Sequence, residues 1–150
     1  MNFKDYKTES LERIAADPSH AKHHEEIEAI LQTREGHLYV KRGIEVLRKV
    51  AESGETTNYK VFYEACVGGN VKWNHTKMGK TAKFLGSVQR SCAEHDLPIL
   101  TALVVNIQTN ECGEGFFKDM CANNLAAAHD DPKEVARKER ARCWNWAASR

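Results

Sequence analysis

The sequence predicts a mainly α-helical protein with one β-hairpin, and three observations support this fold class. Apolar residues recur at helical spacing in several segments that are bounded by capping residues, glycine or proline. Residues that favour β-strands are nearly all confined to positions 98–117, PILTALVVNIQTNECGEGFF. The length of 150 residues, with 41% hydrophobic and 29% charged residues, suits a single domain over 1–150.

Two helices are expected in the first 36 residues. One spans Thr8 to Ala16 and ends before Asp17-Pro18, because proline disfavours helix at the residue before it. Ser19 is then expected to cap a second, thinly amphipathic helix that ends at Gly36. Residues 1–36 are therefore predicted to form a helical N-terminal arm.

Three further helices are expected between residues 37 and 97. His37 to Glu52 has a strong apolar periodicity, and Ser53-Gly54 ends it. A short helix over Tyr59–Val67 is capped by Thr57 or Asn58. A connector follows, and the third helix runs from Lys80 or Thr81 to the residues before Leu97-Pro98.

The third helix has two opposite faces at 100° per residue. One face is basic and polar, and the other is the predicted buried stripe of Thr81, Phe84, Leu85, Val88 and Cys92. A glycine inside a helix costs about 1 kcal/mol relative to alanine. Gly86 is therefore expected to mark a close approach to a neighbouring helix.

The segment 98–117 is expected to form the hairpin. Residues 99–105, with Phe116 and Phe117, would be its apolar base, and residues 106–111 would be its polar tip. The tip contains Glu111 and no Lys or Arg, which is a poor composition for gripping phosphate.

The C-terminal region is predicted to be helical again. A short helix and a loop are expected after Phe117, and Pro132 suits the first position of a charged helix capped by Asp130 or Asp131. Trp144 and Trp146 should dock on the domain or on a partner. Residues 118–150 are thus predicted to be a C-terminal helical extension of a core over 37–117.

From residue 37 the predicted order is helix, short helix, glycine-bearing connector, basic-faced helix and hairpin. This is the order of a winged helix-turn-helix, in which the second helix of the pair enters the DNA major groove and the wing lies against the backbone. The sequence therefore predicts this fold, with additional N- and C-terminal helices.

The same stretch also resembles a family. Its matching residues are Leu85-Gly86, Cys92, Pro98, Leu103-Val104-Val105 and Gly113-Glu114-Gly115-Phe116. The pattern is similar to that of a winged-helix-type domain of bacterial and phage proteins, found in some of them alongside restriction nucleases. The family pattern has a proline where this chain has Cys112. The resemblance covers residues 38–117 at most and implies DNA binding; the chain shows no nuclease partner domain.

The distribution of charge also favours an anionic partner. The formal net charge is +1, but residues 71–110 carry five Lys or Arg against two Asp or Glu. Since one-signed stretches meet oppositely charged partners, the prediction is a regulator or mobile-element accessory factor that binds duplex DNA. The residues expected to contact DNA are Lys72, His75, Lys77, Lys80, Lys83, Ser87 and Arg90.

Two other classes of function remain open. The chain could be a small phage-type inhibitor or adaptor that binds a host protein or nucleoprotein complex, with the acidic segment Glu9–Glu35 meeting a basic groove. An enzyme would need a site such as Cys112, Glu114 and His129, but no phosphate loop, HExxH or GxSxG motif is present. The expectation is therefore a protein without catalytic activity.

Metals, cofactors and a membrane are not expected. A zinc site from Cys92, His95, Cys112 and Cys121 lacks a recognised spacing, and His20, His23 and His24, although on one helical face, are better explained as a polar surface. No apolar run suits a membrane helix or a signal peptide, so a cytoplasmic location is expected. A homodimer through the terminal helices would strengthen DNA binding.

Overall fold

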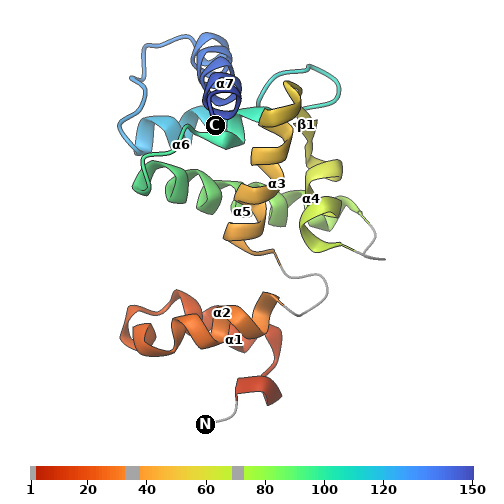
Figure 1. Ribbon diagram of the computed structural model, residues 1–150, viewed down its shortest axis with the longest axis vertical. Helices are drawn as coiled ribbons and strands as arrows, with labels where there is room; N and C mark the ends of the chain where they lie inside the picture. Colours follow the sequence, from red (N-terminus) through yellow and green to blue (C-terminus); the bar gives the residue numbers. More distant parts are fainter. Residues whose placement is uncertain (1–2, 33–37, 69–72) are drawn as a thin grey trace.

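The computed structural model describes residues 3–32, 38–68 and 73–150, and these residues are mainly helical with one small sheet (Figure 1). The 3₁₀ helices are η1 (Phe3–Asp5), η2 (Pro18–His23) and η3 (Leu100–Leu103), and the strands are β1 (Thr57–Asn58) and β2 (Val104–Val105). The α-helices are α1 (Thr8–Ala16), α2 (His24–Gln32), α3 (Val40–Ser53), α4 (Tyr59–Val67), α5 (His75–Glu94), α6 (Glu114–Ala122) and α7 (Pro132–Ala148).

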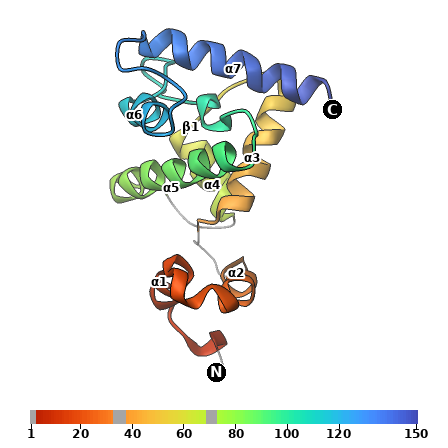
Figure 2. The same cartoon turned by 90° about the vertical axis from the view of Figure 1, so that its left-hand side faces the viewer.

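The described residues contain two separate hydrophobic cores. The smaller core lies between α1 and α2 and consists of Phe3, Leu11, Ile27 and Leu31. The larger core is shared by α3, α4, α5, η3, β2, α6 and α7. Figures 1 and 2 show the α1–α2 pair below this larger body, with α7 lying across the opposite end. Among the described residues, no helix is both long enough and apolar enough to span a bilayer.

The predicted helix over Thr8–Ala16 is confirmed, but the start of the next helix differs from the prediction. Asp17, and not Ser19, is the capping residue: its Oδ1 accepts hydrogen bonds from the Ser19 N–H at 3.0 Å and the Ser19 hydroxyl at 2.8 Å. Pro18 has no N–H to satisfy, so the carboxylate serves the next donor along the chain. The 3₁₀ turn η2 results, and α2 begins only at His24. The predicted end at Gly36 lies outside the described residues.

The C-terminal end of α3 and both ends of α4 agree with the sequence, whereas α3 begins at Val40 and not at His37. Gly54 terminates α3 in the left-handed region, with φ of 72°, a conformation that glycine adopts without steric cost. Asn58 caps α4 by accepting a hydrogen bond from the Val61 N–H at 3.0 Å. In contrast, α5 begins at His75 and not at Lys80 or Thr81, because the Asn74 side chain accepts from the Lys77 N–H and caps it.

Close backbone approaches fix the position of α5. A Cβ atom on Gly43 of α3 would lie 3.0 Å from Phe84 Cζ and 3.1 Å from Val88 Cγ2, so a larger residue here would force these side chains of α5 to shift. A Cβ on Gly86 would lie 3.3 Å from Asp119 Oδ2 on α6, which confirms the predicted close approach at Gly86.

The predicted hairpin over 98–117 is wrong. Its first half forms η3 and β2, and β2 pairs with β1 in parallel, with Thr57 opposite Val104 and Asn58 opposite Val105. Residues 106–111 form a tight loop closed by the Asn106 N–H and the Glu111 carbonyl, which are 2.8 Å apart. Residues 114–117, expected in the second half of the hairpin, instead begin α6, which continues through the short helix expected after Phe117 and ends at Ala122.

The physical reason is that side chains of α7 bond to the backbone between Ile99 and Ala102, while β1 pairs with Val104 and Val105. Glu139 Oε2 accepts from the Ile99 N–H at 2.9 Å, and the Cys143 thiol donates to the Ile99 carbonyl at 3.4 Å. Arg140 Nε donates to the Ala102 carbonyl at 3.0 Å. We call Glu139, Arg140 and Cys143 the α7 polar cluster. Because residues 98–105 are buried, these bonds remove the need for a hairpin ladder.

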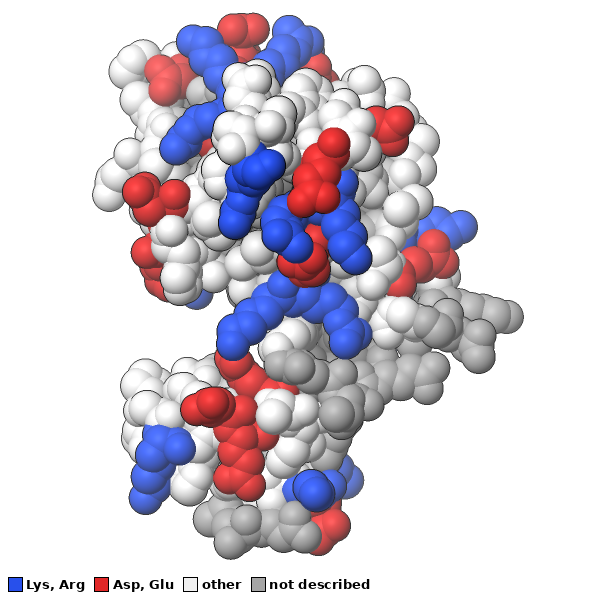
Figure 3. Space-filling model, in the orientation of Figure 1, with Lys and Arg blue, Asp and Glu red and all other residues white. Residues whose placement is uncertain are grey.

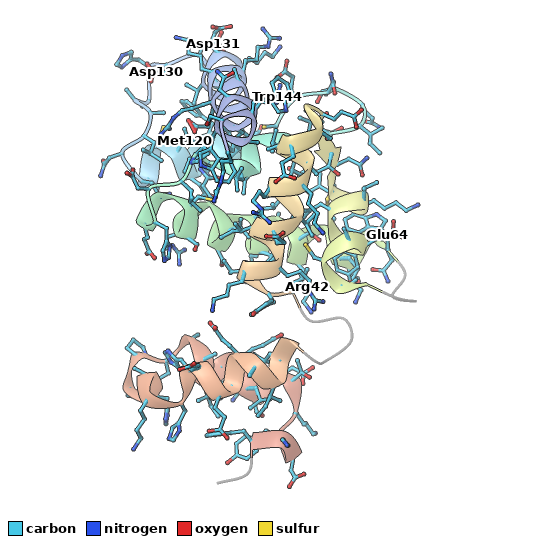
Figure 4. All side chains as sticks on the ribbon, viewed as in Figure 1. Arg42, Glu64, Met120, Asp130, Asp131 and Trp144 are labelled. Atoms are coloured by element: carbon cyan, nitrogen blue, oxygen red, sulfur yellow. The ribbon has the colours of Figure 1, made fainter. Side chains whose placement is uncertain are left out.

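The two C-terminal tryptophans dock on the domain itself. Trp144 Nε1 donates to the Glu55 carbonyl at 2.9 Å, which joins α7 to the end of α3 (Figure 4). Trp146 is half-buried, and the Arg150 guanidinium lies 4.7 Å from its ring centroid. The predicted cap and start of this helix at Asp131 and Pro132 are confirmed. Helix α7 is therefore built into the larger core.

The first prediction concerns the α7 polar cluster. Glu139→Ala leaves the buried Ile99 N–H without its acceptor, which should lower the free energy of unfolding by about 1–3 kcal/mol. Urea denaturation measures this change. Lys138→Ala, an exposed neighbour on α7, should change stability by less than about 0.5 kcal/mol. Equal stabilities of the two variants would contradict the role given to Glu139.

The second prediction compares two helix glycines. Gly43→Val forces methyl groups into the Phe84 and Val88 side chains, and such overpacking should cost about 1–3 kcal/mol. Gly79 has no atom within 4 Å of its Cβ position, so Gly79→Val should leave stability unchanged or slightly raised. Thermal unfolding of both variants measures the difference. An unfolding temperature of Gly43→Val equal to that of Gly79→Val would show that α3 and α5 do not pack this closely.

Candidate nucleic-acid interface

The buried side of α5 anchors the helix in the larger core. Thr81, Phe84, Leu85, Val88 and Cys92 are all buried, which confirms the predicted stripe. The stripe also contains a polar anchor that the sequence analysis missed. Gln89 is 1% exposed; its Oε1 accepts from the Thr101 hydroxyl at 3.1 Å, and its Nε2 donates to the Phe116 carbonyl at 3.3 Å. These contacts fix the rotation of α5 about its own axis.

The opposite side of α5 carries basic side chains. Lys80, Lys83 and Arg90 are exposed and Ser87 is half-buried, as the helical spacing predicted. We call these four residues the α5 basic face. Among the described residues, the three cations form no ion pair. At 1.5 Å per residue the face extends for about 15 Å along the helix, and Glu94 is the acidic residue at its end.

Of the other three predicted contact residues, only Lys77 has a described side chain, and it does not join this face. Lys77 is half-buried in the first turns of α5 and lies about 60° from Lys80, on the side away from Lys83 and Arg90. His75 starts the helix and is not part of a connector, and its side chain lies outside the described part of the structure. Lys72 also falls outside the described residues.

Helix α3, which packs across α5, adds further basic side chains. Lys41, Arg42 and Lys49 are exposed, and Arg42 Nη1 donates to the Cys66 carbonyl at 3.1 Å (Figure 4). Figure 3 shows Lys and Arg side chains gathered over this helix, with acidic ones among them. Glu28 Oε2 of α2 lies 3.9 Å from Lys41 Nζ. One cation at the start of α3 is thus already paired with a carboxylate of the same chain.

The loop 106–111 occupies the position in the chain that was expected for the wing tip. It contains no Lys or Arg, and Arg137 of α7 donates to Glu111 Oε1 at 2.8 Å. This pairing holds the base of the loop against α7. The loop therefore presents no cation to a phosphate.

The residues considered for catalysis do not form an assembled site. The Cys112 thiol donates to the Ala102 carbonyl at 3.3 Å, and Glu114 is exposed at the start of α6. His129 is 87% exposed and pairs with Asp130 at 3.6 Å. In the described structure, Cys112, Glu114 and His129 form no hydrogen bond or ion pair with one another.

The cysteines and histidines that could have bound a metal ion do not come together in the described structure. No group of three or more His, Cys, Asp or Glu side chains within the described ranges is arranged to hold a metal ion. His20 pairs with Asp17, the His23 ring packs edge-on against Phe3, and His24 contacts the Asp17 carbonyl. The three histidines therefore serve the local structure of the arm.

Comparisons with known proteins add nothing to this geometry. No family model, curated protein or solved structure matches this chain.

A second surface was missed by the sequence analysis. A groove of about 410 Å³ lies where the start of α4, the start of α5 and the loop 106–111 meet. The signal that could have revealed it is Ile107, an apolar residue inside the polar run NIQTN. We call this surface the amide groove; its lining residues are Asn58, Tyr59, Lys60, Trp73, Met78, Asn106, Ile107 and Gln108.

The third prediction concerns cysteine reactivity. Burial raises the pKa of the Cys66 thiol to about 12, and burial also raises the pKa values of Cys92 and Cys143. Because the thiolate is the reactive form, these three residues should resist a thiol reagent in the folded protein near pH 8 and react on unfolding. Mass spectrometry of the labelled peptides distinguishes them from the less buried Cys121. Fast labelling of Cys143 in the folded protein would contradict the packing of α7.

Proposed function

We propose that this protein binds duplex DNA through the α5 basic face and acts as a regulator or accessory factor. The observation that carries the proposal is the set of exposed cations, Lys80, Lys83 and Arg90, that have no ion-pair partner within the described structure. Unpaired cations on one rigid surface release counterions when they neutralise phosphates, which favours binding to DNA.

The geometry of α5 suits the major groove. This groove is about 12 Å wide and admits an α-helix. The buried anchors of α5 lie on one side only, so Lys83, Ser87 and Arg90 project from a helix that is held firmly from behind. Lys83 and Arg90 could reach guanine acceptors or phosphates, and the Ser87 hydroxyl could bond either.

The order α3, α4, α5 supports a helix-turn-helix arrangement, in which α5 would be the recognition helix. The second half of the proposed wing is absent, since the loop 106–111 leads directly to α6. In this proposal DNA affinity depends on α5 and the exposed cations of α3. Few contacts imply modest affinity for DNA, and a homodimer would strengthen this binding.

A second candidate function is that of an adaptor or inhibitor that binds a host protein or nucleoprotein complex. The acidic composition of the α1–α2 unit favours it. Over residues 1–32 there are seven Asp or Glu against four Lys or Arg, and Glu25 and Glu26 of α2 are exposed. Such a unit could meet a basic protein surface, with no need for the protein itself to bind DNA.

The fourth prediction tests the DNA-binding proposal. Fluorescence anisotropy with a random duplex of about 25 base pairs should show binding that weakens steeply with salt. Lys83→Glu and Arg90→Glu should each weaken binding and reduce the slope of log K against log salt by about 1, because each removes a phosphate contact. Lys138→Glu on α7 makes the same charge change elsewhere and should have little effect. No binding by the wild type at about 10⁻⁴ M would exclude the proposal and favour the adaptor.

A further inference from the structure

The amide groove is a second surface, distinct from the α5 basic face. Met78, which lines it, lies about 160° around α5 from Lys80. The volume of about 410 Å³ falls within the range of about 300–1,000 Å³ that is typical of ligand pockets. A ligand could therefore occupy the groove while α5 contacts DNA.

Apolar side chains line the groove in spite of its exposure to solvent. Ile107 is 73% exposed and Met78 is 40% exposed. Trp73 is half-buried, and its ring packs edge-on against Tyr63 with 5.5 Å between centroids. Methionine and aromatic side chains are enriched in the buried parts of protein interfaces. The lining of the amide groove thus has the composition of a protein–protein interface.

The loop that carries Ile107 is held in one conformation by its own hydrogen bonds. The Asn110 N–H donates to the Asn106 carbonyl at 2.7 Å, and the Gln108 N–H donates to Asn106 Oδ1 at 2.9 Å. The Asn106 N–H, bonded to the Glu111 carbonyl, closes the loop. Because the loop is already ordered, burying the exposed Ile107 side chain against a partner would not cost the entropy of ordering the loop.

The polar groups of the groove favour an occupant rich in hydrogen-bond acceptors. Asn58 and Asn106 already use Oδ1 for the Val61 and Gln108 N–H groups, and their amide NH₂ groups have no protein acceptor within the described residues. Among the described lining residues, Lys60 is the charged one and none is Asp or Glu. Free donors and one cation complement peptide carbonyls and a carboxylate.

We propose that the amide groove binds an extended segment of a partner protein that presents a bulky apolar side chain next to an aspartate or glutamate. The apolar side chain contacts Ile107 and Met78, and the carboxylate pairs with Lys60. The amide groups of Asn58 and Asn106 donate to the backbone carbonyls of the segment. Binding of this segment by the amide groove does not depend on DNA binding by the α5 basic face.

The fifth prediction tests this proposal with peptides displayed on phage. Selection of a random library against the full-length protein should enrich sequences that pair a bulky apolar residue with Asp or Glu. For a synthetic peptide of the enriched sequence, calorimetry should show a loss of affinity of about tenfold or more with Ile107→Asp and with Met78→Asp, as expected for central interface residues. Lys60→Glu should lower the affinity for the acidic peptide and raise the affinity for an analogue that has lysine in place of the acidic residue.

Two controls separate this site from the rest of the molecule. Leu125→Asp changes another exposed apolar residue, which does not line the groove, and should leave peptide affinity unchanged. Lys83→Glu should keep peptide binding, and Ile107→Asp should keep DNA binding, so either function can fail alone. The proposal is overturned if no peptide is enriched, or if enriched peptides bind Ile107→Asp and Met78→Asp as tightly as the wild type.

Discussion

The structure depends on the hydrogen bonds that α7 makes to the buried segment 99–102. This segment crosses the larger core, where an unpaired backbone N–H or C=O is costly. Glu139 accepts from the Ile99 N–H, the Cys143 thiol and the Ala102 N–H both donate to the Ile99 carbonyl, and Arg140 donates to the carbonyl of Ala102. A C-terminal helix, far away in sequence, thus supplies hydrogen bonds to residues that precede the short strand β2.

This arrangement also determines how α5 is presented. Thr101 belongs to the same buried segment and bonds Gln89, which in turn bonds the first turns of α6 at Phe116. Gly43 lets α3 pack against Phe84 and Val88 on the adjacent side of α5. With three neighbours fixed in this way, one side of α5 remains for solvent or a partner, and that side carries the α5 basic face.

Local patterns were sufficient for most helices and insufficient for segment 98–117. The periodicity of α3, the Asn58 cap of α4 and the buried stripe of α5 were predictable because they depend on residues close in sequence. The hairpin was mispredicted because strand propensity is a weak preference that tertiary contacts override. Nothing local to Leu100 indicates that Glu139 and Arg140 would bond its neighbours.

The candidate sites, too, were predictable from the sequence only where they depend on residues close together in the chain. The exposed position of Lys80, Lys83 and Arg90 follows from helix geometry alone, whereas Lys77 was misplaced because the Asn74 cap was not recognised. The amide groove combines three separate segments of the chain, so no single stretch of sequence defines it.

Binding of duplex DNA by the basic side of α5 is tested most directly by an NMR titration of the isotope-labelled protein with a random duplex at low and high salt. We expect amide shift changes between Lys80 and Arg90 and at the start of α3, and their loss at high salt. Shift changes confined to the loop 106–111, or no changes at low salt, would contradict it.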